Sequence, residues 1–97
     1  MLGREQGRRL PCLVISVDAL NHGPADVIIV LPMTTRDRGI PIHVAVDPPE
    51  GGLRQRSFIK CEDIRSVSIE RFINRWGAVA SRTLTETEDR LRIILAL

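Results

Sequence analysis

A short basic segment runs directly into an apolar strand near the start of the chain. Residues 3–9 contain two glycines and three arginines, and Pro11 then leads into the apolar, β-branched run 12–17. We expect 3–9 to form a loop and 12–17 a buried strand. A loop at the end of a rigid strand presents guanidinium groups in a fixed place, where they suit a phosphate. The segment therefore predicts an anion-binding site.

Arginine is the dominant cation of the whole chain. Of its 14 basic residues, Lys60 is the one lysine, and the net charge is only +2. Arginine suits bidentate contacts to phosphates and base edges, which favours a nucleic-acid partner; codon bias in a GC-rich genome is the alternative. Solvated loop charge explains one arginine cluster more easily than three. The clusters are Arg4, Arg8 and Arg9; Arg36 and Arg38; and Arg54 and Arg56.

The sequence offers little for disulfide, metal or membrane chemistry. Cys12 and Cys61 fall in expected strands, where buried thiols are the ordinary interpretation for a cytoplasmic protein. His22 and His43 have no spacing with them that is typical of zinc, so we expect no metal and no cofactor. No apolar run approaches the roughly 20 residues that cross a bilayer, and no secretory leader is recognisable. We therefore expect a cytoplasmic protein without a membrane partner.

Short strands are the elements that must position these groups. Residues 42–46 alternate with a period of two, which places Ile42, Val44 and Val46 on one face. Pro32, near the end of another apolar run, predicts a bulge or a sheet edge. We expect one domain over residues 1–97, mainly β, forming a small, partly open barrel or compact sheet. The expected strands are 12–17, 25–31, 42–46, 57–61, 64–68 and 73–80, with a helical turn at 69–72.

The end of the chain predicts one packing helix. Residues 83–86, Thr-Leu-Thr-Glu, fit a capping box with Thr83 as the N-cap. Two pairs with favourable i,i+4 order, Glu86–Arg90 and Glu88–Arg92, are expected on its surface. The helix should cover one end of the sheet with a single apolar face. That face comprises Leu84, Leu91, Ile94 and Leu95.

Three segments resemble, in this order, motifs of the MazF/PemK (Kid) family of toxin ribonucleases. Residues 3–7, Gly-Arg-Glu-Gln-Gly, are similar to the family's first active-site loop. Residues 31–36, Leu-Pro-Met-Thr-Thr-Arg, resemble the strand that ends in its catalytic threonine. Residues 59–66, Ile-Lys-Cys-Glu-Asp-Ile-Arg-Ser, resemble the R-C-D-Q-x-R-[ST] segment of the Kid branch. The resemblance implies an SH3-like small barrel of the MazF/PemK/CcdB type with a C-terminal helix.

The resemblance also implies an activity and its residues. The family's members are metal-independent, sequence-specific endoribonucleases of type II toxin–antitoxin systems that cut single-stranded RNA by attack of the 2′-hydroxyl. Such a reaction needs a base, an acid and cations at phosphorus. Lys60 and Glu62, two apart in an expected strand, should share a face, although an exposed ion pair is the alternative. The implied catalytic residues are Thr34, Glu62 as base, Lys60 and Arg9.

Further contacts and partners follow from the same resemblance. We expect single-stranded RNA and a cognate antitoxin as partners, and a homodimer. The expected substrate-binding residues are Arg4, Glu5, Gln6, Arg8, Arg36, Arg38, Arg54 and Arg56.

Two departures from the family pattern keep other functions open. The family's arginine before the proline falls on Leu10, and we expect the strand that usually precedes Gly3 in the family to be missing. A leucine cannot donate a hydrogen bond to a phosphate. One alternative is therefore a catalytically disabled copy that still binds its antitoxin. Another is a non-catalytic toxin of the same fold, similar to the gyrase-inhibitor branch.

Overall fold

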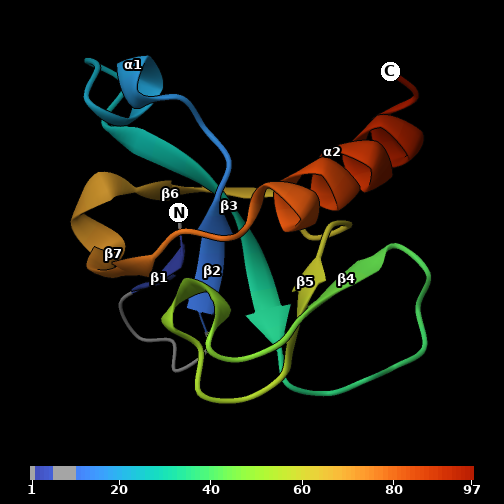
Figure 1. Cartoon of the computed structure of the whole chain (residues 1–97). Helices are drawn as coiled ribbons and strands as arrows, with labels where there is room; N and C mark the ends of the chain where they lie inside the picture. Colours follow the sequence, from blue (N-terminus) through green and yellow to red (C-terminus); the bar gives the residue numbers. More distant parts are fainter. Residues whose placement is uncertain (1, 6–10) are drawn as a thin grey trace.

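An antiparallel sheet and one long helix make up most of the computed structural model, which describes residues 2–5 and 11–97 (Figure 1). This confirms the predicted fold class, mainly β with a C-terminal helix. The strands are β1 (Leu2–Glu5), β2 (Pro11–Val14), β3 (Val27–Thr34), β4 (His43–Val46), β5 (Ser57–Lys60), β6 (Arg65–Ser68) and β7 (Phe72–Gly77). The helical elements are α1 (Asp18–Asn21), the 3₁₀ turns η1 (Glu50–Gly52) and η2 (Ile69–Arg71), and α2 (Ser81–Leu95).

Strand β3 is the point at which the sheet forks. One of its edges pairs with β2, whereas the other pairs with β6 over residues 27–30 and with β5 over residues 33 and 34. Pro32 lies between these two stretches and is buried inside the strand. The carbonyl of Ile29 faces β2, so alternation turns the missing N–H of Pro32 to the forked edge. The proline therefore lies at the break between two partners, so the predicted edge is a local one at the fork, and the pairing of β3 with β2 shows no bulge there.

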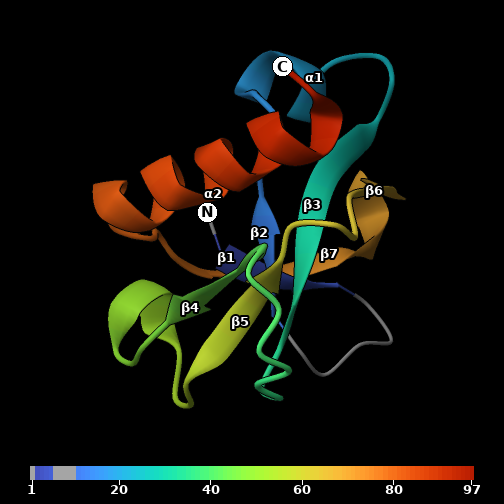
Figure 2. The same ribbon diagram turned by 90° about the vertical axis from the view of Figure 1, so that its right-hand side faces the viewer.

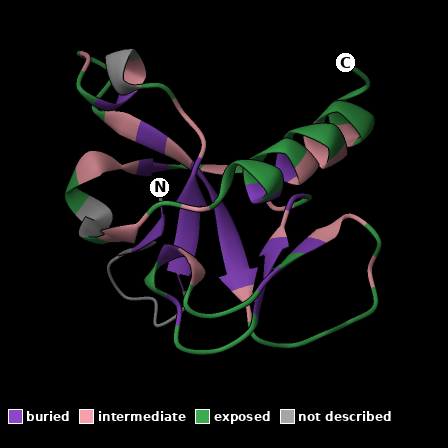
Figure 3. Ribbon diagram, in the orientation of Figure 1, coloured by how far each residue is buried: buried purple, intermediate pink, exposed green. Residues whose placement is uncertain are grey.

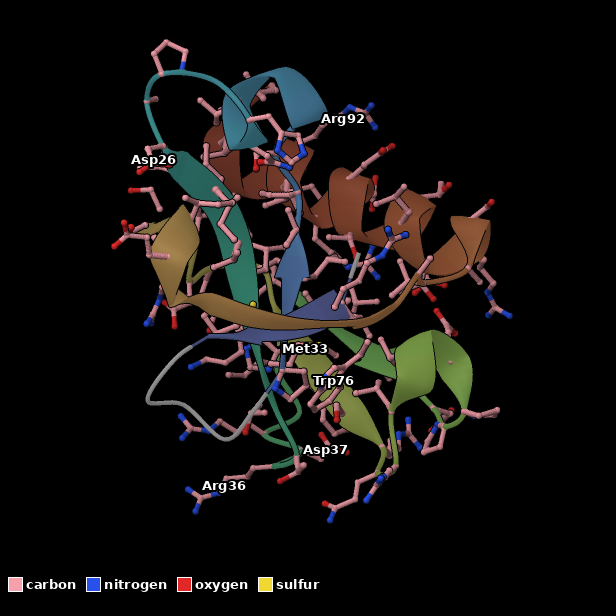
Figure 4. The ribbon with its side chains drawn as sticks, turned by 90° about the vertical axis from the view of Figure 1, so that its left-hand side faces the viewer. Asp26, Met33, Arg36, Asp37, Trp76 and Arg92 are labelled. Atoms are coloured by element: carbon pink, nitrogen blue, oxygen red, sulfur yellow. The ribbon has the colours of Figure 1, made fainter. Side chains whose placement is uncertain are left out.

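The predicted loop at residues 3–9 is wrong in its first part, which forms strand β1. Residues 3–5 belong to this strand, which pairs with β2 on one side and β7 on the other. Leu2 is completely buried in the core, which holds the strand against the sheet. In Figure 4 the ribbons of β1 and β7 cross the direction of β2 and β3, so the sheet bends sharply there. The rest of the predicted loop, residues 6–9, lies outside the described residues.

Strand β3 is largely buried, as its purple stretches in Figure 3 show, and its apolar residues contribute to two core clusters. Leu31 and Met33 belong to the larger core cluster, which packs under α2 together with residues of β4 and β5. Ile28 and Val30 belong to a second cluster with residues of β2 and β6. Burial on both faces explains why this strand is a continuous apolar run in the sequence. β4 instead alternates as predicted, with Val44 and Val46 buried and Ala45 exposed.

Helix α2 runs across one side of the sheet (Figures 1 and 2), but the predicted capping box is wrong. Ala80 is the N-cap and makes no side-chain cap of its own. The carboxylate of Glu50 in η1 accepts hydrogen bonds from the Ala80 N–H (2.9 Å) and from the Thr83 hydroxyl (2.5 Å). A residue 30 positions earlier in the chain therefore caps this helix.

The face that α2 buries also differs from the predicted one. Thr83 and Thr87 are buried, and Leu91 and Ile94 pack against the core. Leu84 and Leu95, predicted to lie on the packing face, are 41% and 49% exposed. The helix therefore approaches the sheet through two threonines in its first half, where apolar side chains were expected. The ion pair of Glu86 also differs: its partner is Arg82, at 3.2 Å.

Candidate active site

The register of β3, β4 and β5 places four residues on one side of the sheet. Thr34 lies opposite Phe58, and His43 lies opposite Lys60. Their neighbours Met33, Val44 and Ile59 point into the core beneath α2, so the four point the other way. We call this side the outer face. Thr34 and Lys60 are diagonal neighbours on it, with Cα atoms about 7–8 Å apart in such a ladder. The structure thus brings together two of the predicted catalytic residues.

The prediction that Lys60 and Glu62 share a strand face is wrong. Strand β5 ends at Lys60, so Glu62 follows in a turn, where the rule that residues two apart share a face no longer applies. Its carboxylate contacts the Nε2 atom of His43 at 2.9 Å. The His43 side chain is only 3% exposed and lies behind Glu62, whose side chain is 38% exposed. Glu62 is therefore the member of this pair that solvent reaches.

The surroundings of Glu62 favour its charged form. Partial burial is the largest single influence on this carboxyl and opposes ionisation, whereas hydrogen bonds from His43 and the backbone favour the charged form. Together with the nearby charges of His43 and Lys60, they hold the pKa of Glu62 below its ordinary value. The carboxylate is consequently ionised at neutral pH and can accept a proton, although as a weaker base than an unperturbed glutamate.

Lys60 instead shares the carboxylate of Asp63 with Arg65. The Lys60 Nζ atom lies 3.3 Å, and the Arg65 Nη2 atom 2.7 Å, from the same Oδ2 oxygen. Partial burial opposes ionisation of Asp63, but these two cations hold its pKa below the ordinary value. The outer face therefore carries two cations and a charged carboxylate between them.

Two arginine-bearing loops leave the sheet at the end where β3 finishes and β5 begins. Arg36 and Arg38 are exposed in the loop after β3, and the Arg36 N–H donates to the Thr34 hydroxyl at 3.2 Å. Figure 4 shows Arg36 beyond the end of β3. Arg54 and Arg56 are exposed in the loop before β5. The Arg56 guanidinium lies 5.4 Å above the ring of Phe58, the residue opposite Thr34.

Other predicted site residues lie in β1 or outside the described part of the chain. Arg4 and Glu5 lie in β1, where Arg4 pairs with Pro11 of β2. Glu62 lies in the turn after β5, outside the register that sets Thr34 beside Lys60. The residues outside the described part of the chain are Gln6, Arg8, Arg9 and Leu10.

Sequence reasoning missed three residues of the cluster, namely His43, Asp63 and Arg65. A signal for His43 was present, because it occupies an outward position in the alternating run 42–46. Arg65 stands in the last motif of the resemblance and received no role. Asp63 is a local neighbour of both cations, three positions after Lys60 and two before Arg65, but the turn between β5 and β6 is what brings the three side chains together.

Other chemistry finds little support in the described part of the chain. Burial and the neighbouring Glu62 charge raise the pKa of Cys61 from 9.0 to about 11, against a smaller effect of Arg90. This thiol is therefore neutral at pH 7 and a poor nucleophile. Among residues 2–5 and 11–97, no three His, Cys, Asp or Glu side chains are grouped to hold a metal ion. No helix in these residues is long and apolar enough to cross a membrane.

Comparison with known proteins identifies the family. Residues 1–95 match the family described as PemK-like, MazF-like toxin of type II toxin-antitoxin system. Endoribonuclease EndoA of Bacillus subtilis is 28% identical over 98 residues, covering 100% of this chain and 84% of that protein. The Mycobacterium tuberculosis toxin MazF-mt6 superposes with a TM-score of 0.86 at 20% identity, over 99% of this chain and 96% of the toxin.

A further solved structure has the same fold. It is an endoribonuclease in complex with its cognate antitoxin from a mycobacterial species. Its TM-score is 0.82 at 23% identity, and the match covers 99% of this chain and 91% of that one. The fold, the family match and the order of the three motifs agree, and the chain belongs to the PemK-like, MazF-like toxins of type II toxin–antitoxin systems.

Proposed function

We propose that this chain is an endoribonuclease toxin that cuts single-stranded RNA without a metal ion. The observation that carries this proposal is the strand register, which sets Thr34 beside Lys60 on the outer face. Exposed arginines leave the same end of the sheet and can bind flanking phosphates. The family, and the endoribonuclease EndoA among its relatives, support the same activity.

In the proposed reaction, Lys60 binds the phosphate, which then lies between Thr34 and Glu62. Glu62 takes the proton of the 2′-hydroxyl, whose oxygen forms a bond to phosphorus while the bond to the 5′-oxygen breaks. Water protonates the departing 5′-oxygen, so the products are a cyclic phosphate and a 5′-hydroxyl end. Lys60 neutralises the phosphate, and the Thr34 hydroxyl donates a hydrogen bond to it. His43, almost buried behind Glu62, holds that carboxylate in place.

Residues outside this cluster keep the roles that the resemblance implies. Arg9 would donate to the developing negative charge at phosphorus, because Leu10 cannot. The arginines of the two described loops would bind neighbouring phosphates of the RNA. Further RNA-binding residues in the proposal are Arg4, Glu5, Gln6 and Arg8.

The proposal includes the partners of a type II toxin. A cognate antitoxin should bind the chain, as the relative solved in complex with its own antitoxin suggests. A homodimer is part of the same proposal. Because messenger RNA is its substrate, we also infer that the protein acts in the cytoplasm.

The test is cleavage of single-stranded RNA by the purified protein in EDTA, with the new ends mapped. We expect 5′-hydroxyl ends that disappear in Glu62→Gln and persist in Glu88→Gln, a control with the same charge change on an exposed part of α2. Cleavage that appears only in Leu10→Arg would identify a disabled ribonuclease. If neither protein cuts RNA, the proposal is wrong; inhibition of DNA gyrase would then favour the gyrase-inhibitor alternative.

A further inference from the structure

Lys60 and Arg65 form a pair of converging cations at the fork of the sheet. Lys60 ends β5 and Arg65 begins β6, and both strands pair with the same edge of β3. The turn between them is closed by a hydrogen bond of 3.0 Å from the Asp63 N–H to the Lys60 carbonyl. Two donors from different strands are thereby directed at one point. We call these two residues the cation clamp.

The point of convergence is occupied by the protein's own carboxylate. Both cations contact the same oxygen of Asp63, at 3.3 Å and 2.7 Å. All three side chains are partly open to solvent, with 31% of Lys60, 30% of Asp63 and 27% of Arg65 exposed. A ligand can therefore reach the clamp, but in the free protein its charge is already partly neutralised.

A phosphate oxygen and a carboxylate oxygen need the same kind of hydrogen-bond donors from such a site. Each is an anionic acceptor for guanidinium and ammonium donors, with similar hydrogen-bond lengths. Asp63 and an RNA phosphate therefore compete for the same donors. Asp63 also stands where the resembled Kid segment has a neutral glutamine, so its negative charge distinguishes this chain from that pattern.

We propose that Asp63 is an internal counter-ion that occupies the cation clamp of Lys60 and Arg65 until an RNA phosphate displaces it. This rests on the proposed function and adds Arg65 to the phosphate-binding residues. Asp63 thus weakens RNA binding by the free protein. The opposite role, in which Asp63 positions the cations for RNA, predicts the opposite effect of removing its charge.

The experiment measures binding of a fluorescein-labelled, single-stranded 2′-O-methyl oligoribonucleotide, which lacks the nucleophile and cannot be cut. We expect Asp63→Asn to lower the Kd by about 2- to 5-fold, the range of a partly exposed charge interaction. Glu88→Gln, with the same charge change on α2, should leave the Kd unchanged.

Two further variants keep the result interpretable. Asp63→Gln should behave like Asp63→Asn, which covers the case in which one of them folds poorly. Asp63→Glu keeps the competing charge and should bind like the wild type. Equal or weaker binding by folded Asp63→Asn or Asp63→Gln, with RNA cleavage by the wild type intact, would overturn the counter-ion role alone. Absence of both RNA binding and cleavage in every variant would overturn this role together with the proposed function.

Discussion

Two neighbouring residues of β5, Ile59 and Lys60, have opposite surroundings. Ile59 is completely buried and faces the core beneath α2. Lys60, the next residue, lies on the outer face with its side chain 31% exposed and paired with Asp63. The contrast indicates a functional division. The inner face, which packs beneath α2, stabilises the fold, whereas the outer face can carry charged side chains. Neighbouring substitutions should therefore affect different properties of the protein.

The largest expected effect on stability belongs to the inner face. Ile59→Ala removes a fully buried side chain from the main core and should lower the free energy of unfolding by about 2–5 kcal/mol. Urea denaturation measures this loss. Lys60→Met serves as the neighbouring comparison and should cost less than about 1 kcal/mol, because a partly exposed ion pair contributes little. Equal losses in the two variants would contradict the division.

A smaller effect is expected where η1 holds the helix against the inner face. Glu50→Ala removes the acceptor for the Ala80 N–H and the Thr83 hydroxyl, and should cost about 1 kcal/mol, as the loss of a helix cap does. Thermal unfolding followed by circular dichroism would check it. Glu88→Ala, an exposed glutamate of the same helix, is the matched control and should change little. Identical melting temperatures for the two variants would show that Glu50 is not the cap.

The two carboxylates near the outer face should make the stability of the fold depend on pH in the acidic range. The pKa values of Glu62 and Asp63 are depressed in the folded protein from ordinary values of 4.5 and 3.8. Their contribution to stability is therefore fully present above those values, and it is lost as the pH falls through the lower, folded values. Melting temperatures measured from pH 7 to pH 3 should fall less steeply in the double variant Glu62→Gln/Asp63→Asn. An unchanged slope would mean that the outer-face contacts do not stabilise the fold.

The smallest effect should come from the solvent side of α2, which belongs to neither face of the sheet. Arg82 pairs with Glu86 at 3.2 Å, and its side chain is 90% exposed. Arg82→Ala should change the free energy of unfolding by no more than about 0.5 kcal/mol, because such i,i+4 pairs are weak. Urea denaturation at low salt is the measurement. A loss approaching that of Ile59→Ala would contradict this ranking.

Local sequence patterns predicted the buried strands well. The alternation in residues 42–46 identified the buried face of β4, and apolar runs located β2 and β3 to within a few residues. β1 was missed because its segment is polar and glycine-rich, and only its pairing with β2 and β7 makes it a strand. The helix start was misplaced for a similar reason, since its cap comes from Glu50 in a distant turn.

The candidate site was predicted only in part, because side-chain partners depend on strand register. Thr34 and Lys60 were identified through the resemblance, and the register of β3 and β5 brings them together. The partner of Glu62 could not be inferred, because His43 lies 19 positions earlier and reaches it only across the paired strands. The sequence indicated which residues were candidates for the site, whereas the pairing of the strands determines which of their side chains are in contact.

Single-turnover cleavage of RNA by Lys60→Met, with its stability measured in parallel, tests most directly whether the outer face carries the chemistry. We predict a rate lower by about 10²–10³-fold, the usual result of removing a group that stabilises the transition state. The free energy of unfolding should stay within about 1 kcal/mol of the wild type, because Asp63 keeps Arg65 as a partner. Cleavage at the wild-type rate by folded Lys60→Met would contradict the central role of this face.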